Sequence, residues 1–241
     1  MKRRAIKFLN TLIAALLILS AAIAATGQNK TAQRPEANAS SAQASADIKA
    51  AEDVHYTYEF KQPQFQVPRI LIEHDATGRG RISFERKNMT EAFTEPVQLS
   101  SDALKRISLL WDSLRFLDSN TEYQSEKQFP HQGTQLISMQ QGARRRTAEF
   151  NWTNDHNAFL LVTEYRRIAD QALFVFDINI ARESDPLGTP RLLKNLDALI
   201  SRNALSDSHQ LVPLLRDLTT DERLPLIARN QAQRLLKRIE K

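Results

Sequence analysis

His131 and Thr134 come nearest to a catalytic pair in this chain, because a base and a hydroxyl lie close together in one short segment. In the segment His131-Gln-Gly-Thr134 the imidazole could activate the threonine as a nucleophile. Such a pair also needs an acid that orients the imidazole and donors for an oxyanion, and the sequence places neither. His131 is therefore a candidate for a hydrolase, and the competing interpretation is a loop that leads into a strand.

Other signatures of enzyme chemistry are missing from the sequence. The chain has five histidines, none of them paired at a metal-ligand spacing, and it has no cysteine. Neither a G-x-S-x-G elbow nor a G-x-x-x-x-G-K-[ST] phosphate loop is present. Glu73 and Asp75 would share one face of a strand, but acidic residues are common where strands end. The sequence thus predicts no metal site and no cofactor, and it favours a non-catalytic protein.

Arginines form the sharpest charge run, Arg144-Arg145-Arg146, with Arg166 further along the chain. On a strand Arg144 and Arg146 would point to one face, where with Arg166 they could bind an anion or a cell-wall polymer. The alternative is an edge strand that charge protects against aggregation.

Arg229 and Arg234 are candidates for partner binding on the predicted C-terminal helix. Basic residues near the end of a helix also complement its dipole, so stability alone explains much of their placement.

The elements that must position these residues form two regions. Residues 54–185 predict an α+β domain, because period-two alternation favours strands over 54–60, 69–74, 81–86, 136–140 and 144–150. Two amphipathic helices, over about 101–117 and 154–181, would pack on the resulting antiparallel sheet of hairpins. The last part of the second helix, 173–181, is rich in aromatic and β-branched residues, so a strand is also compatible there.

Residues 186–241 predict an all-helical region with helices over 190–202, 207–218 and 224–241. Pro190 and Pro225 stand where a first helical turn tolerates proline. The segment 206–241 resembles a single HEAT-type helical hairpin. The resemblance is carried by Val212, Pro213, Leu214, Leu215 and Leu218, by Asp221 in the turn, and by Arg229, Ala232, Leu236 and Ile239.

The N-terminus predicts export. Residues 1–24 combine a basic start, an apolar stretch and an A-x-A end, the pattern of a signal peptide; an uncleaved membrane anchor is the alternative. Removing them takes away four of the 33 basic residues and none of the 28 acidic ones, which leaves a net charge of +1. Residues 25–53, rich in Ala, Ser and Gln, predict a disordered linker. A nearly neutral chain lacks the electrostatic attraction that nucleic-acid binding needs.

Taken whole, the layout resembles uncharacterised exported bacterial proteins with a signal peptide, a small α+β domain and a HEAT-like helical C-terminus. Within 65–150 the likeness is carried by Leu99, Ser100, Leu104, Leu110 and Phe116. Some proteins of this layout are protease inhibitors. The resemblance implies this architecture and a periplasmic or secreted location, with membrane contact only through an uncleaved signal segment. The missing catalytic signatures, the linker and the helical tail predict that the partner is another envelope or extracellular protein. We expect a non-catalytic protein-interaction module, with an anion or cell-wall polymer binder and an exported hydrolase as the alternatives.

Overall fold

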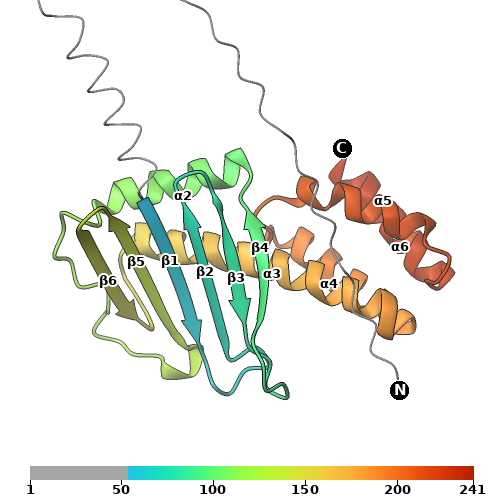
Figure 1. Ribbon diagram of the computed structural model, residues 1–241, viewed down its shortest axis with the longest axis horizontal. Helices are drawn as coiled ribbons and strands as arrows, with labels where there is room; N and C mark the ends of the chain where they lie inside the picture. The colour runs from blue at the N-terminus through green and yellow to red at the C-terminus, as the bar shows by residue number, and fades with distance from the viewer. Residues whose placement is uncertain (1–53) are drawn as a thin grey trace, which may run out of the picture.

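The structure is a computed structural model and describes residues 54–241. The signal peptide and linker predicted for 1–24 and 25–53 lie outside the described residues. The chain from β1 onward forms a sheet covered by helices and then a helical region, as predicted (Figure 1).

A six-stranded antiparallel sheet, with strand order β4-β3-β2-β1-β5-β6, makes up the first half. Its strands are β1 (Val54–Lys61), β2 (Arg69–Asp75), β3 (Arg79–Phe84), β4 (Phe93–Gln98), β5 (Thr134–Gln141) and β6 (Arg144–Phe150). The five predicted strands are all confirmed. β4 was not predicted, because its sequence FTEPVQ offers only two apolar side chains and contains a proline.

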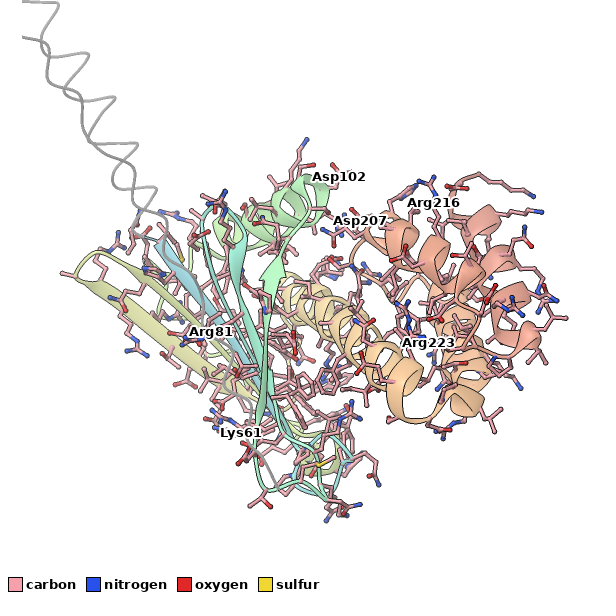
Figure 2. All side chains as sticks on the ribbon, turned by 45° about the vertical axis from the view of Figure 1, so that its right-hand side comes forward. Lys61, Arg81, Asp102, Asp207, Arg216 and Arg223 are labelled. Atoms are coloured by element: carbon pink, nitrogen blue, oxygen red, sulfur yellow. The ribbon has the colours of Figure 1, made fainter. Side chains whose placement is uncertain are left out.

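The two faces of the sheet differ in character because side chains alternate along each strand. Tyr58, Ile72 and Ile82 are fully buried on the face that the helices cover. The opposite face carries charged side chains that pair across strands, such as Arg81 with Glu73 at 2.7 Å. Figure 2 shows Lys61 and Arg81 on this uncovered side.

Helix α2 (Ser101–Leu114) lies across one end of the strands. The Ser100 hydroxyl accepts a hydrogen bond from the Ala103 amide at 3.3 Å, which begins the helix. Ile107 and Trp111 point from it into the sheet core. Arg115, with φ of 44°, ends the helix in a left-handed conformation.

Helix α3 (His156–Ser184) is shared by two hydrophobic cores. Its first half, with Leu161 and Tyr165, packs on the sheet, and its second half, with Phe174 and Ile178, packs in the helical region. The strand considered for 173–181 is wrong, because the whole stretch is helical. Its apolar residues surround the helix because the two cores approach it from different sides.

The C-terminal region is helical, as predicted. It consists of a short 3-10 turn η2 (Pro186–Gly188), α4 (Thr189–Ser201), a second turn η3 (Ser208–Leu211), α5 (Val212–Thr220) and α6 (Leu226–Ile239). Helices α3 and α4 pack together, α5 packs on α6, and α4 contacts α6. Their leucines and alanines form the second core. The fold is therefore α+β with a helical C-terminus.

None of the helices within 54–241 combines the length and the apolar character that crossing a bilayer requires.

Side-chain contacts join the two halves. Arg106 on α2 pairs with Glu164 on α3 at 3.1 Å and donates to the Ser206 carbonyl at 2.7 Å. The Gln171 side chain on α3 accepts from the Asp207 amide at 2.9 Å. Figure 2 shows Asp102 and Asp207 at this junction, beside α2 and the turn before α5. Because of these bonds, the helical region has a defined position against the sheet.

Candidate functional site

A large cleft lies where β1 and β2 meet the middle of α3. We call it the α3 cleft; residues 62–68 and the short 3-10 turn η1 (Pro130–Gln132) form its rim. Its volume of about 1040 Å³ is several times that of the grooves beside β4 and between α4 and α6, about 290 and 250 Å³. A cleft of this size can accommodate a small ligand or a short peptide segment.

The floor of the α3 cleft is apolar. It is lined by Phe60, Phe65, Val67, Ile70, Ala169 and Leu173. The ring centres of Phe60 and Phe65 are 5.9 Å apart, and Phe65 remains 45 % exposed. An exposed aromatic side chain at the mouth of an apolar cleft is a feature of binding sites.

Gln62 holds the rim together. Its buried side chain donates from Nε2 to the carbonyls of Pro130 and His131, both at 2.9 Å, and its backbone amide donates to the Pro68 carbonyl at 2.8 Å. Gly133 closes the turn with φ of 88°, and a Cβ at this position would lie 2.5 Å from the Phe60 ring. The rim is thus built by contacts that leave no room for a side chain at Gly133.

Two charged side chains, Arg166 and Asp170, enter the α3 cleft from α3. The Arg166 guanidinium lies over the Phe60 ring, 5.9 Å from its centre. Neither side chain forms an ion pair within 54–241, and Arg166 lies close enough to the Tyr58 hydroxyl to offset in part the rise that burial causes in the pKa of that phenol. Burial raises the pKa of Asp170, and the charges of Arg202 and Arg166 only partly offset this effect. The cleft therefore presents one exposed cation and one half-buried anion that form no ion pair within this part of the chain.

Tyr58 closes the deep end of the cleft with a neutral phenol. Its hydroxyl donates to Gln135 Oε1 at 2.6 Å, and burial raises the pKa of Tyr58 to about 12. A protonated, hydrogen-bonded phenol of this kind positions other groups and does not act as a base near neutral pH.

His131 and Arg166 both line the α3 cleft. From the sequence, His131 was a candidate for a hydrolase and Arg166 for an anion binder, so the fold brings together residues from two different hypotheses. The imidazole stands edge-on to the Phe129 ring, with ring centres 6.0 Å apart. Thr134 is not among the lining residues, and no serine, threonine or cysteine of 54–241 lines this cleft. The arrangement can bind a ligand, and the cleft brings no hydroxyl or thiol side chain of a serine, threonine or cysteine of 54–241 beside the histidine.

Arg144 and Arg146 lie outside the cleft, on strand β6 at the edge of the sheet, and their side chains bond to other residues of the same chain. Arg146 donates to the carbonyls of Phe116 and Thr121 at 2.7 and 2.6 Å, and its guanidinium lies 4.6 Å from the centre of the Phe116 ring. Arg144 pairs with Asp118. Both arginines thus anchor the loop that follows α2, and Arg166 does not join them.

Arg229 and Arg234 lie on α6, far along the chain from the cleft. Arg229 is half-buried, and its Nε has no hydrogen-bond partner in the described region. Arg234 borders a groove between α4 and α6 with Lys194 and Arg238, and Arg238 pairs with Asp197 at 2.7 Å. Neither Arg229 nor Arg234 lines the α3 cleft.

Sequence reasoning missed Asp170 and Phe65. The spacing of four residues between Arg166 and Asp170 was a usable signal, since it places both on one face of a helix. Phe65 gave no periodic signal because it lies in a turn. Within 54–241 no group of three or more His, Asp or Glu side chains could hold a metal ion.

Comparison with known proteins adds no functional assignment. No protein-family model matches the chain, and no curated protein shows significant similarity to it. The geometry of the α3 cleft is therefore the basis for a functional proposal.

Proposed function

We propose that the chain is an exported, non-catalytic protein-interaction module and that the α3 cleft receives a segment of its partner. The observation that supports this proposal is an apolar cleft with an exposed phenylalanine at its mouth and, on its wall, an arginine and an aspartate that form no ion pair within 54–241. Such a site fits a peptide that inserts an apolar side chain and offers charged groups to the wall.

Export is part of the proposal and depends on the signal-peptide pattern of residues 1–24. The partner would then be another envelope or extracellular protein. The two alternatives gain less support from the geometry. Arg144 and Arg146 are engaged by the protein itself, and no serine or threonine of 54–241 lines the cleft beside His131.

The test is site-specific photo-crosslinking in cells, with a photoreactive residue at position 65 or, as a control, at position 145 on the uncovered sheet face. We expect a discrete crosslinked partner from position 65 that is absent from position 145. Leu173→Arg, which fills the cleft with a charged side chain, should abolish this crosslink without lowering the amount of folded protein. Equal crosslinking from both positions, or a product that survives Leu173→Arg, would rule out the cleft as the interaction site.

A further inference from the structure

The charged groups of the α3 cleft are arranged as a separated pair. Arg166 and Asp170 lie one turn apart on α3, where oppositely charged side chains commonly pair with each other. Here both side chains line the cleft, and they do not pair with each other. The wall of the cleft therefore carries a positive and a negative group side by side above an apolar floor.

Each of the two groups has unused hydrogen-bonding capacity. The Asp170 carboxylate is half-buried and accepts no hydrogen bond from the described residues, so only the nearby charges of Arg202 and Arg166 offset its burial, and they do so in part. The Arg166 guanidinium is exposed, lies 5.9 Å from the centre of the Phe60 ring and approaches the Tyr58 hydroxyl, and its five N–H donors exceed what that one hydroxyl can accept. A ligand with an ammonium group and a carboxylate would supply both missing partners.

We propose that the α3 cleft binds a short unblocked peptide with an apolar side chain. Its ammonium group pairs with Asp170, its carboxylate pairs with Arg166, and its side chain packs on the floor formed by Phe60, Phe65 and Leu173. This inference goes beyond the proposed function, because a free peptide with two charged ends is a different ligand of the same cleft from a segment of an intact partner protein. A dipeptide suits the site, since its end charges are separated by about 6 Å, comparable to the spacing of side chains one helical turn apart.

The test is calorimetric titration of the full chain with leucyl-leucine in four forms: free, N-acetylated, C-amidated and blocked at both ends. We expect the free dipeptide to bind about tenfold more tightly than either singly blocked form, because each block removes one charge-assisted hydrogen bond in a half-exposed site. The doubly blocked form should bind most weakly.

Two variants assign each end group to its residue. In Asp170→Asn, acetylation of the dipeptide should no longer weaken binding, whereas amidation still should. In Arg166→Gln the pattern should be reversed. Asp112→Asn on α2 and Arg145→Gln on β6 make the same chemical changes at exposed positions outside the cleft, and they should leave all four affinities unchanged.

The outcomes separate this inference from the proposed function. Equal binding of the free and doubly blocked dipeptides would overturn recognition of the end groups while leaving an apolar interaction site in place. Absence of binding by any form at millimolar concentration would also overturn it, and the crosslinking at position 65 would then decide the proposed function independently. A matching thermal midpoint for each variant excludes unfolding as the cause of a loss.

Discussion

The hydroxyl of Tyr165 on α3 lies 2.9 Å from Nε2 of His74 on β2, inside the sheet core. Trp111 on α2 donates its Nε1–H to the same hydroxyl at 3.1 Å, so the hydroxyl proton is free to point at His74. Nδ1 of His74 faces the Asp75 carbonyl at 2.8 Å and therefore carries the ring proton. The network requires a neutral His74, and it ties β2, α2 and α3 together.

His74 should make the stability of the protein depend on pH. Burial lowers the pKa of His74 below its ordinary value of 6.5, and the Asp75 carbonyl offsets this only in part. Below pH 6.5 the histidine is protonated in the unfolded chain but stays neutral in the folded chain until a lower pH. The contribution of His74 to the free energy of unfolding is therefore complete above pH 6.5 and is lost as the pH falls. We expect the free energy of unfolding to decrease by at most about 1.4 kcal/mol per pH unit from this one group.

Urea denaturation at a series of pH values measures this effect. His74→Gln should have a smaller slope below neutral pH than the native chain, whereas His55→Gln, exposed on the same strand pair, should retain it. An unchanged slope in His74→Gln would show that other groups cause the pH dependence.

Tyr165→Phe should destabilise the protein by about 2 kcal/mol, because it leaves both the His74 nitrogen and the Trp111 N–H buried without a partner. Tyr123→Phe is the matched control. Tyr123 is also buried, at 3 % exposure, but its hydroxyl has no hydrogen-bond partner in the described residues. Its removal should change the free energy of unfolding by less than about 0.5 kcal/mol. Equal losses in the two variants would contradict the network.

Arg146→Ala should lower the free energy of unfolding by about 2 kcal/mol and expose the loop after α2 to proteolysis. The variant loses two hydrogen bonds to loop carbonyls and the contact with the Phe116 ring. Arg146→Lys should not restore stability, because an ammonium group cannot bond both carbonyls in the fork geometry of arginine. Arg145→Ala, at an exposed position, should have little effect. Unchanged stability in Arg146→Ala would instead favour the anion-binding hypothesis for this edge.

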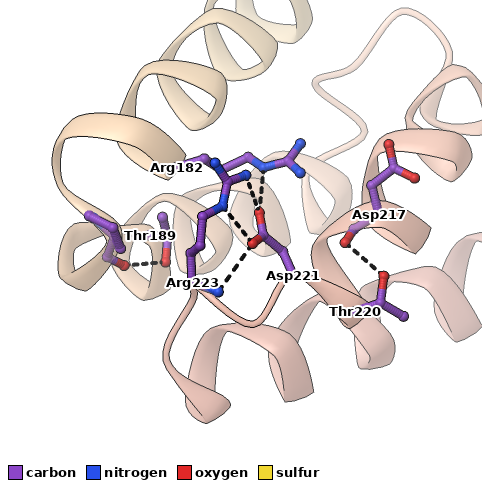
Figure 3. Close-up of polar contacts among 7 residues, drawn as sticks. Arg182, Thr189, Asp217, Thr220, Asp221 and Arg223 are labelled. Atoms are coloured by element: carbon purple, nitrogen blue, oxygen red, sulfur yellow. Dashed lines mark hydrogen bonds and ion pairs between the residues drawn. The ribbon is translucent and has the colours of Figure 1, made fainter.

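Asp221, in the turn between α5 and α6, should stabilise the helical half. Its carboxylate accepts from Arg182 at 3.0 Å and from Arg223 at 2.8 Å (Figure 3). The bond from Arg223 holds the pKa of Asp221 well below its ordinary value of 3.8, so this contribution is present above that pH and lost as the pH falls below it.

Asp221→Asn should cost about 1–3 kcal/mol at neutral pH in thermal or urea unfolding, since the side chain is only 7 % exposed and carries the link to α3. Asp217→Asn is the control, because Thr220 contacts only the backbone carbonyl of Asp217. Equal stability of the two variants would show that the Arg182 link is not significant.

The sequence predicted the sheet and the helices where hydrophobic periodicity was strong, and it failed at β4. The Leu99 amide donates to Gly78, on the β3 side, so alternation directs the amide positions of Thr94, Pro96 and Gln98 to the free edge. Proline has no backbone N–H, and at Pro96 the missing N–H would have pointed away from β3. The hydrogen bonds between β4 and β3 are therefore unaffected. Hydrophobic periodicity cannot predict β4, because this strand is held by its backbone hydrogen bonds to β3 and not by an alternation of apolar side chains.

The candidate site was only partly predictable for a similar reason. His131 and Arg166 were recognised as unusual polar residues, but their common location depends on the pairing of β1 with β5 and on the packing of α3 over the sheet. The spacing of residues along the chain does not predict contacts between segments that are distant in sequence. Local signals did predict the helix over about 101–117, whose start the Ser100 hydroxyl caps, because a helix start depends on nearby residues alone.

The shared helix α3 has a consequence for cooperativity. The buried residues of the sheet core extend on α3 to Ala169 and those of the second core begin at Phe174, while Phe176 still packs against the sheet core. If either half unfolded, α3 would lose the apolar contacts that this half makes with it. Because the other half also packs on α3, we expect the two halves to unfold together in one transition. A ligand seated beside Asp170 would accordingly raise the melting temperature of the whole chain in a single transition.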